Sequence, residues 1–195
     1  MRVAINGFGR IGRSVFRILN SKKNVSVVAI NDIADNDAMA YLLKYDTVMG
    51  PFKDSVSLEG DIMKTSKNQI KMVAERDPSL LPWKEMEVDV VIEATGIFRE
   101  KSQLQQHINA GAKRVILTVP SKDEIDYTLV IGVNDDGLNE DHKIISNASC
   151  TTNCLAPMAK ILNDSFEIEY GVINTIHAYT NDQRLADVPH SDWRR

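Results

Sequence analysis

A glycine-rich turn near the N-terminus constrains the fold more than any other feature of the sequence. Residues 7–12 read Gly-Phe-Gly-Arg-Ile-Gly, and they follow the short apolar run of residues 3–5. Apolar residues then recur at helical spacing, at Ile11, Val15, Ile18 and Leu19. A second apolar run, residues 25–30, is followed by Asp32, about 20 residues after the turn. A strand, a glycine turn, a helix and a second strand in this order predict the first βαβ unit of a doubly wound α/β sheet.

The glycine spacing is typical of a dinucleotide-binding turn. Gly7 allows the tight turn, Gly9 lets the backbone approach a pyrophosphate, and Gly12 lets the helix pack closely on the strand. The N-terminus of the helix faces the phosphates. Asp32 would accept hydrogen bonds from the adenosine ribose and would repel a 2′-phosphate, so the sequence favours NAD over NADP as the cofactor. The alternative is a glycine turn in an α/β protein that binds no cofactor.

The residues beyond Asp32 continue the alternation of helix and strand patterns. Helices are expected at residues 38–45 and 101–110, and strands at residues 88–94, 113–118, 129–133 and 143–146. Short polar–apolar alternation in residues 55–74 predicts small antiparallel strands at the edge of the sheet. Strands with interleaved helices predict a doubly wound, Rossmann-type sheet. We expect Trp83 to be a packing residue, and His107 and His142 to be solvated surface residues without a role.

A second stretch, residues 146–154, reads Ser-Asn-Ala-Ser-Cys-Thr-Thr-Asn-Cys and lies between a strand pattern and a helix pattern. This order puts Cys150 at or next to a helix N-terminus. The unpaired N–H groups there carry about half a positive charge and favour the thiolate, which is the form that attacks carbonyl carbon. The alternative is a cysteine that only fills the core. We expect Cys154 to be buried, one helical turn further on.

The character of the sequence changes after Cys150. Residues 168–178 alternate as a long strand, and this strand carries His177. A cysteine paired with a histidine would form a nucleophile and its acid/base partner, although a structural histidine fits the spacing equally well. The polar and basic residues 180–184 and 193–195 would suit an exposed loop that holds phosphate.

Composition excludes several classes of protein. The net charge of −4 and the absence of a basic run argue against a nucleic-acid or membrane surface. Two cysteines without clustered histidines fit neither a disulfide framework nor a zinc site, and they favour a reducing compartment. We see no signal peptide, and no apolar run approaches the roughly 20 residues of a membrane span. We therefore expect a cytoplasmic protein.

Three motifs together resemble the phosphorylating glyceraldehyde-3-phosphate dehydrogenases of the bacterial type. They are residues 5–13, residues 146–154, and residues 177–183, which read His-Ala-Tyr-Thr-Asn-Asp-Gln. The resemblance covers the whole chain, and the cysteine motif is highly specific. It implies a Rossmann-type NAD-binding domain over residues 1–149, and the truncated beginning of an α+β catalytic domain over residues 150–195.

The resemblance also implies a role for each matching residue. Cys150 would be the nucleophile and His177 its partner. Cofactor contacts would come from Gly7, Gly9, Arg10, Ile11, Gly12, Asp32, Arg76 and Thr118. Substrate or inorganic phosphate would be held by Ser149, Thr151, Thr180 and Arg195, with Arg194 as a substitute for Arg195. Pro189, after Val188, matches the NAD-using members of the family.

The implied activity is the NAD-dependent oxidative phosphorylation of glyceraldehyde 3-phosphate in glycolysis, by a homotetramer. Because the family's members are longer, a polypeptide of these residues alone is expected to be inactive. One alternative is erythrose-4-phosphate dehydrogenase, whose members usually differ after the histidine, where this chain has Ala178-Tyr179-Thr180-Asn181. The other is a catalytically silent NAD-binding module.

Overall fold

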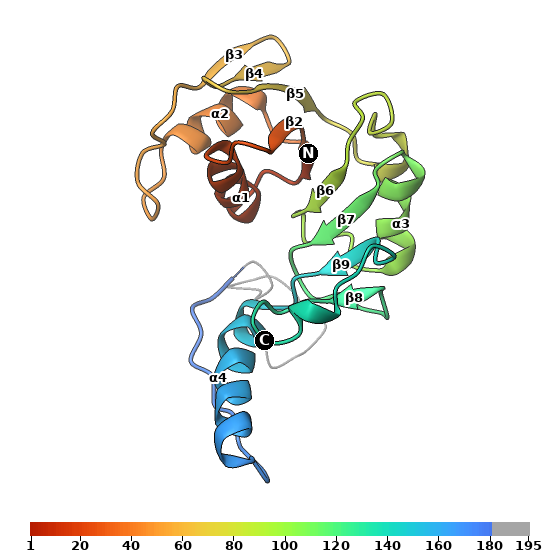
Figure 1. The fold of residues 1–195 in the computed structure, drawn as a ribbon. Coiled ribbons are helices and arrows are strands. Elements are labelled where there is room, and N and C mark those ends of the chain that lie inside the picture. The colour runs from red at the N-terminus through yellow and green to blue at the C-terminus, as the bar shows by residue number, and fades with distance from the viewer. Residues whose placement is uncertain (181–195) are drawn as a thin grey trace, which may run out of the picture. The chain divides into compact units, whose positions relative to one another are not determined.

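The structure is a computed structural model that describes residues 1–180. The chain divides into two compact units, Met1–Lys160 and Ile161–Arg195, and each unit is described by itself. The first unit contains every strand of the described chain (Figure 1). The second contains the end of the last helix and an extended segment.

A nine-stranded sheet forms the centre of the first unit, in the order β3-β4-β5-β2-β1-β6-β7-β9-β8 (Figure 1). The strands are β1 (Arg2–Asn6), β2 (Ser26–Asn31), β3 (Ser57–Glu59), β4 (Ile62–Lys64), β5 (Gln69–Val73), β6 (Val90–Glu93), β7 (Arg114–Leu117), β8 (Tyr127–Thr128) and β9 (Ile144–Ser146). From β5 to β8 every pairing is parallel. The chain runs from β1 outward through β2 on one side, and returns to β6 on the other side of β1. This reversal confirms the predicted doubly wound sheet.

Four α-helices and two 3₁₀ turns accompany the strands. They are α1 (Arg10–Asn20), α2 (Asn36–Lys44), α3 (Lys101–Asn109), α4 (Cys150–Phe166), η1 (Pro78–Leu80) and η2 (Asp135–Gly137). Asp35 caps α2, because its carboxylate accepts the N–H of Ala38 at 2.8 Å. At α3 the Gln103 side chain accepts the backbone N–H of Glu100 at 3.1 Å. No helix in residues 1–180 is both long and apolar enough to span a membrane.

The sheet has an apolar core on each face. Successive residues of β1 point to opposite faces, so Val3 and Ile5 join one core and Ala4 joins the other. The first core receives Phe16 of α1 and residues of α2. The second receives Leu104 of α3 together with Trp83, which is fully buried as predicted. Helices therefore cover both faces, as a doubly wound sheet requires.

The predicted antiparallel strands are confirmed at one edge of the sheet. β3 pairs with β4 and β4 with β5, both antiparallel, while β5 continues the sheet in parallel beside β2. At the other edge the predicted strand over residues 129–133 is wrong, because pairing ends with Thr128. The partner strand β9 ends at Ser146, and residues 131–134 form a turn. In this turn the Asn134 side chain accepts the N–H of Val130 at 2.8 Å and donates to the carbonyl of Thr128 at 2.9 Å, on the outer side of β8. The side chain thus takes the place of a neighbouring strand.

The predicted strand over residues 168–178 is also wrong. The segment after α4 is extended, but it has no ladder partner among the described residues. Its apolar side chains lie in solvent, and Val172 and Ile176 are 95% and 97% exposed. Alternating side chains are only one requirement of a strand, because its N–H and C=O groups also need a neighbouring backbone.

The packing of α3 on the sheet leads to a prediction about stability. Leu104 is fully buried on α3, whereas Leu80 in η1 is 68% exposed. Leu104→Ala should lower the free energy of unfolding by about 2–5 kcal/mol, because it leaves a cavity against the sheet. Leu80→Ala, the matched control, should change it by no more than about 0.5 kcal/mol. Chemical denaturation of the full-length protein measures both values, and equal losses in the two variants would contradict the packing described here.

Candidate active site at the carboxyl edge of the sheet

The carboxyl ends of the parallel strands meet at one edge of the sheet. The residues that follow these strands include Gly7 after β1, Asp32 after β2, Arg76 after β5, Thr95 after β6 and Thr118 after β7. Ligands of doubly wound proteins bind at such an edge, where the order of the strands reverses. Four of these residues, Gly7, Asp32, Arg76 and Thr118, are among the predicted cofactor contacts.

Two glycines of the turn are required by close backbone contacts. Gly7 has a φ of +91°, and a Cβ atom on it would lie 2.6 Å from the backbone nitrogen of Thr95. A Cβ on Gly12 would lie 2.1 Å from the carbonyl oxygen of Gly7. Gly9 differs, because a Cβ there would meet nothing within 4 Å in the described chain. Gly7 and Gly12 therefore set the turn, and Gly9 leaves its outer side free for a ligand.

Asp32 ties the end of β2 to this turn. One carboxylate oxygen accepts the N–H of Phe8 at 2.7 Å, and the other accepts the N–H of Ala34 at 2.9 Å. The carboxylate is thus held in place by two backbone groups, and each oxygen can accept a further hydrogen bond. This geometry suits an acceptor for two ribose hydroxyls.

The N-terminus of α1 has no acidic residue in its first turn, and Gly9 at its N-cap offers no capping side chain. The first N–H groups of the helix thus keep their partial positive charge for an anion. The guanidinium of Arg10 pairs with Asp46 at 3.0 Å. The backbone N–H groups of Met49 and Val48, together with Arg10, lower the pKa of Asp46 to about 2. Since that guanidinium is already paired, Arg10 would contact a phosphate through its backbone N–H.

The remaining predicted cofactor residues lie along the same edge. Thr118 donates both its N–H, at 3.0 Å, and its hydroxyl, at 3.1 Å, to the carbonyl of Glu93. Ile11 is 51% exposed in the first turn of α1. Arg76 is exposed in the loop after β5.

Cys150 is the first residue of α4, as predicted. Ser149 caps this helix, since its hydroxyl accepts the N–H of Thr152 at 2.9 Å. The preceding residues are anchored beside the end of β7: Asn147 donates its N–H to Leu117 at 2.9 Å, and the Ser146 hydroxyl donates to Val119 at 2.8 Å. These contacts place the start of α4 at the carboxyl edge, next to β7, which ends at Leu117.

Cys150 and Cys154 are both exposed, and neither forms a disulfide. The prediction that Cys154 is buried is therefore wrong. Its physical reason is that α4 has no buried residue, so no described element covers the face that carries Cys154. Thr151, beside Cys150, is half-buried.

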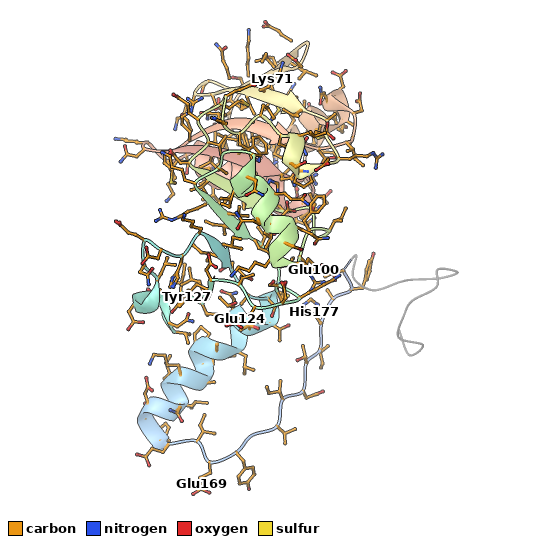
Figure 2. The ribbon with its side chains drawn as sticks, turned by 90° about the vertical axis from the view of Figure 1, so that its right-hand side faces the viewer. Lys71, Glu100, Glu124, Tyr127, Glu169 and His177 are labelled. Carbon is orange, nitrogen blue, oxygen red and sulfur yellow. The ribbon has the colours of Figure 1, made fainter. Side chains whose placement is uncertain are left out.

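His177 belongs to the second unit, on the extended segment after α4 (Figure 2). Thr180 lies in the same unit. The imidazole Nδ1 of His177 lies 2.5 Å from the carbonyl oxygen of Ala178. His177 and Thr180 are therefore described within the second unit alone. Pro189, Arg194 and Arg195 lie outside the described residues.

The prediction that His107 is a solvated surface residue is wrong. His107 is fully buried, and its two ring nitrogens lie 3.0 Å from Trp83 Nε1 and 3.1 Å from a carboxylate oxygen of Glu93. His142 is half-buried and stacks on Tyr127 with ring centroids 4.7 Å apart. Glu93 in the sequence could have indicated that His107 is buried, because an acid inside a buried strand needs a hydrogen-bonding partner from another element.

The helix start gives a prediction about the two thiols. Cys150 lies in the first turn of α4 and Cys154 in the second, so the field of the helix N-terminus acts mainly on Cys150. Iodoacetamide at neutral pH should therefore alkylate Cys150 much faster than Cys154, although both sulfurs are exposed. Peptide mass spectrometry of the folded full-length protein measures both rates. Equal rates would contradict the activation of Cys150.

Comparison with known proteins identifies families that match both the part of the chain with the glycine turn and the part with Cys150. The family model described as "Glyceraldehyde 3-phosphate dehydrogenase, NAD binding domain" matches residues 1–101, and that described as "Glyceraldehyde 3-phosphate dehydrogenase, C-terminal domain" matches residues 149–195. The chain is similar to proteins named glyceraldehyde-3-phosphate dehydrogenase, with 54% identity to that of Borreliella burgdorferi, 53% to that of Thermotoga maritima and 51% to that of Streptomyces coelicolor.

Each of these alignments covers 100% of this chain and 58% or 59% of the relative, so the chain spans less than two thirds of the proteins it matches. The family models nevertheless cover the glycine turn, the end of β2 and the start of α4. The chain belongs to the glyceraldehyde-3-phosphate dehydrogenase family.

Proposed function

We propose that the protein oxidises glyceraldehyde 3-phosphate with NAD and inorganic phosphate, forming 1,3-bisphosphoglycerate in glycolysis. One observation carries this proposal: the dinucleotide-binding turn and the helix start with Cys150 lie on the same edge of one sheet. A nucleophile and a cofactor site on one edge are what a dehydrogenase with a covalent intermediate needs.

The described residues fit NAD. The open side of Gly9 and the uncapped N-terminus of α1 would receive the pyrophosphate. Asp32 would hold the adenosine ribose and would repel a 2′-phosphate. Arg76, Thr118, Arg10 and Ile11 would complete the contacts. NAD supplies the acceptor for the hydride that leaves the substrate.

The residues around Cys150 would carry the covalent chemistry. The thiolate adds to the aldehyde carbon, and the backbone N–H of Cys150 can stabilise the oxyanion that develops. The His177 imidazolium gives this oxyanion a proton, which completes the hemithioacetal. His177 takes the hydroxyl proton as the hydride leaves, and a thioester remains on Cys150. Inorganic phosphate then attacks the thioester carbon, which releases the acyl phosphate and returns the thiolate. Ser149, Thr151, Thr180 and Arg195 would hold the phosphate groups.

We also propose that the protein acts as a homotetramer in the cytoplasm. The exposed side chains of Tyr41, Tyr45 and Val48, which are 62%, 57% and 80% exposed, support association because they form apolar surface around the end of α2. The two free thiols support a reducing compartment.

A turnover assay of the full-length protein tests the proposed activity. With glyceraldehyde 3-phosphate and NAD, NADH should form continuously only when inorganic phosphate is present, because phosphate must regenerate Cys150. Cys150→Ser should abolish turnover, and Cys154→Ser should keep it. Faster turnover with erythrose 4-phosphate would favour the alternative dehydrogenase, and NAD binding without turnover would favour a silent binding module.

Removal of the Asp32 carboxylate tests the cofactor site. Asp32→Ala should weaken NAD binding by up to about 2–4 kcal/mol, because two hydrogen bonds to a charged acceptor are lost. It should also raise the use of NADP relative to NAD, since the repulsion of the 2′-phosphate disappears. Asp37→Ala, on the exposed first turn of α2, is the matched control and should leave NAD affinity unchanged. Calorimetric titration measures both variants, and an unchanged affinity for Asp32→Ala would remove Asp32 from the site.

A further inference from the structure

A carboxylate side chain is buried beneath the glycine turn. Glu93 is the last residue of β6, and its side chain is fully buried. One oxygen lies 2.5 Å from Nδ2 of Asn6 and 3.1 Å from Nε2 of His107. The other accepts both the backbone N–H of Thr95, at 2.9 Å, and the Thr95 hydroxyl. Four donors thus surround one carboxylate, which offsets the desolvation of its charge.

The hydrogen bonds also assign the protons of His107. The indole nitrogen of Trp83 can only donate, so Nδ1 of His107, 3.0 Å away, must accept. The single ring proton therefore lies on Nε2 and points to Glu93. Since a protonated imidazolium has no acceptor for the indole N–H, His107 is neutral in this arrangement.

Glu93 contacts a residue on each side of the close approach between Gly7 and Thr95. Asn6 directly precedes Gly7, and Thr95 is the residue that a Cβ on Gly7 would meet at 2.6 Å. Both Asn6 and Thr95 donate to the same carboxylate. A shift of Glu93 would therefore move Gly7 and Thr95 relative to each other, and the start of α1 would move with Gly7.

The same set of hydrogen bonds extends to the far side of β1. The amide of Asn31 donates to Oδ1 of Asn6 at 2.7 Å and to the carbonyl of Glu75 at 2.8 Å. The backbone N–H of Glu75 donates back to Oδ1 of Asn31 at 2.8 Å. Glu75 precedes Arg76, so the chain of contacts from His107 reaches the loop that was predicted to contact the cofactor.

We propose that Glu93 and His107 are positioning residues of the nucleotide site, in which the Nε2 proton of His107 orients Glu93 so that Asn6 and Thr95 set the glycine turn for a pyrophosphate. This inference rests on the proposed binding of NAD. Neither residue touches the ligand in this account. Their effect passes through the backbones of Gly7 and Thr95, so affinity for the dinucleotide should depend on a donor to Glu93 rather than on the histidine itself.

Two substitutions of His107 separate positioning from general stability. In His107→Gln the amide nitrogen can replace Nε2 and still donate to Glu93. In His107→Asn the shorter side chain can accept from Trp83 but cannot reach Glu93. His107→Asn should weaken NAD binding roughly 3- to 30-fold, whereas His107→Gln should stay within about twofold of the unmodified protein. His142→Gln is the control for loss of a histidine outside the network.

Calorimetry on the full-length protein gives the affinities for NAD. The NMR resonance of the Trp83 indole N–H shows whether residue 107 still accepts the hydrogen bond from Trp83. That resonance should keep its shift in His107→Asn and move in His107→Gln. Equal affinities for the two variants, whether both normal or both weakened, would overturn the inference, as would a weaker His107→Gln. Failure of the unmodified protein to bind NAD would instead overturn the proposed function. If the unmodified protein binds NAD, and Asp32→Ala loses affinity for NAD but His107→Asn does not, only the positioning role is overturned.

A second pair of variants tests the same positioning role if His107→Asn does not fold. Thr95→Val removes the hydroxyl that donates to Glu93 and keeps the size of the side chain, whereas Thr95→Ser keeps the hydroxyl. Thr95→Val should weaken NAD binding roughly 3- to 30-fold, and Thr95→Ser should restore most of it. Unchanged affinity in Thr95→Val would show that the contact with Glu93 does not position the turn.

Discussion

The backbone of Gly7 runs so close to Ala94 and Thr95 that no side chain fits between them. A Cβ on Gly7 would lie 2.8 Å from the carbonyl carbon of Ala94 and 2.6 Å from the nitrogen of Thr95. Gly12 then packs against Gly7 in the same way. These two contacts fix where α1 begins relative to β1 and β6. The position of the helix N-terminus, and with it the anion site, follows from them.

Two helix N-termini lie at the same edge of the sheet. The N-terminus of α1 has no capping side chain, so its N–H groups remain for a ligand. At α4 the hydroxyl of Ser149 takes the N–H of Thr152, while Cys150 occupies the first position of the helix. In the proposed mechanism, the same partial positive charge would attract a pyrophosphate at one helix and would favour a thiolate at the other.

The sequence predicted the features of this edge that depend only on residues close together in the chain. The glycine spacing, the acid at the end of β2 and the helix start at Cys150 each need only neighbouring residues to be recognised. His107 was misjudged because it lies one turn after Leu104 on the buried side of α3, and its partner Glu93 comes from another element. The strand over residues 168–178 was misjudged because alternation does not supply a pairing backbone. The burial of Cys154 failed similarly, since burial needs a covering element that spacing alone does not indicate.

In the proposed mechanism the Cys150 thiolate reacts beside the cofactor at one edge of the sheet, and trapping of the covalent intermediate tests this most directly. The full-length protein would be mixed with glyceraldehyde 3-phosphate and NAD without inorganic phosphate, quenched in acid and digested for mass spectrometry. The account predicts an acyl adduct on the peptide with Cys150, formed only with NAD, together with a burst of NADH. The adduct should disappear when phosphate is added. An adduct on Cys154 alone, or a burst of NADH without any adduct on Cys150, would contradict it.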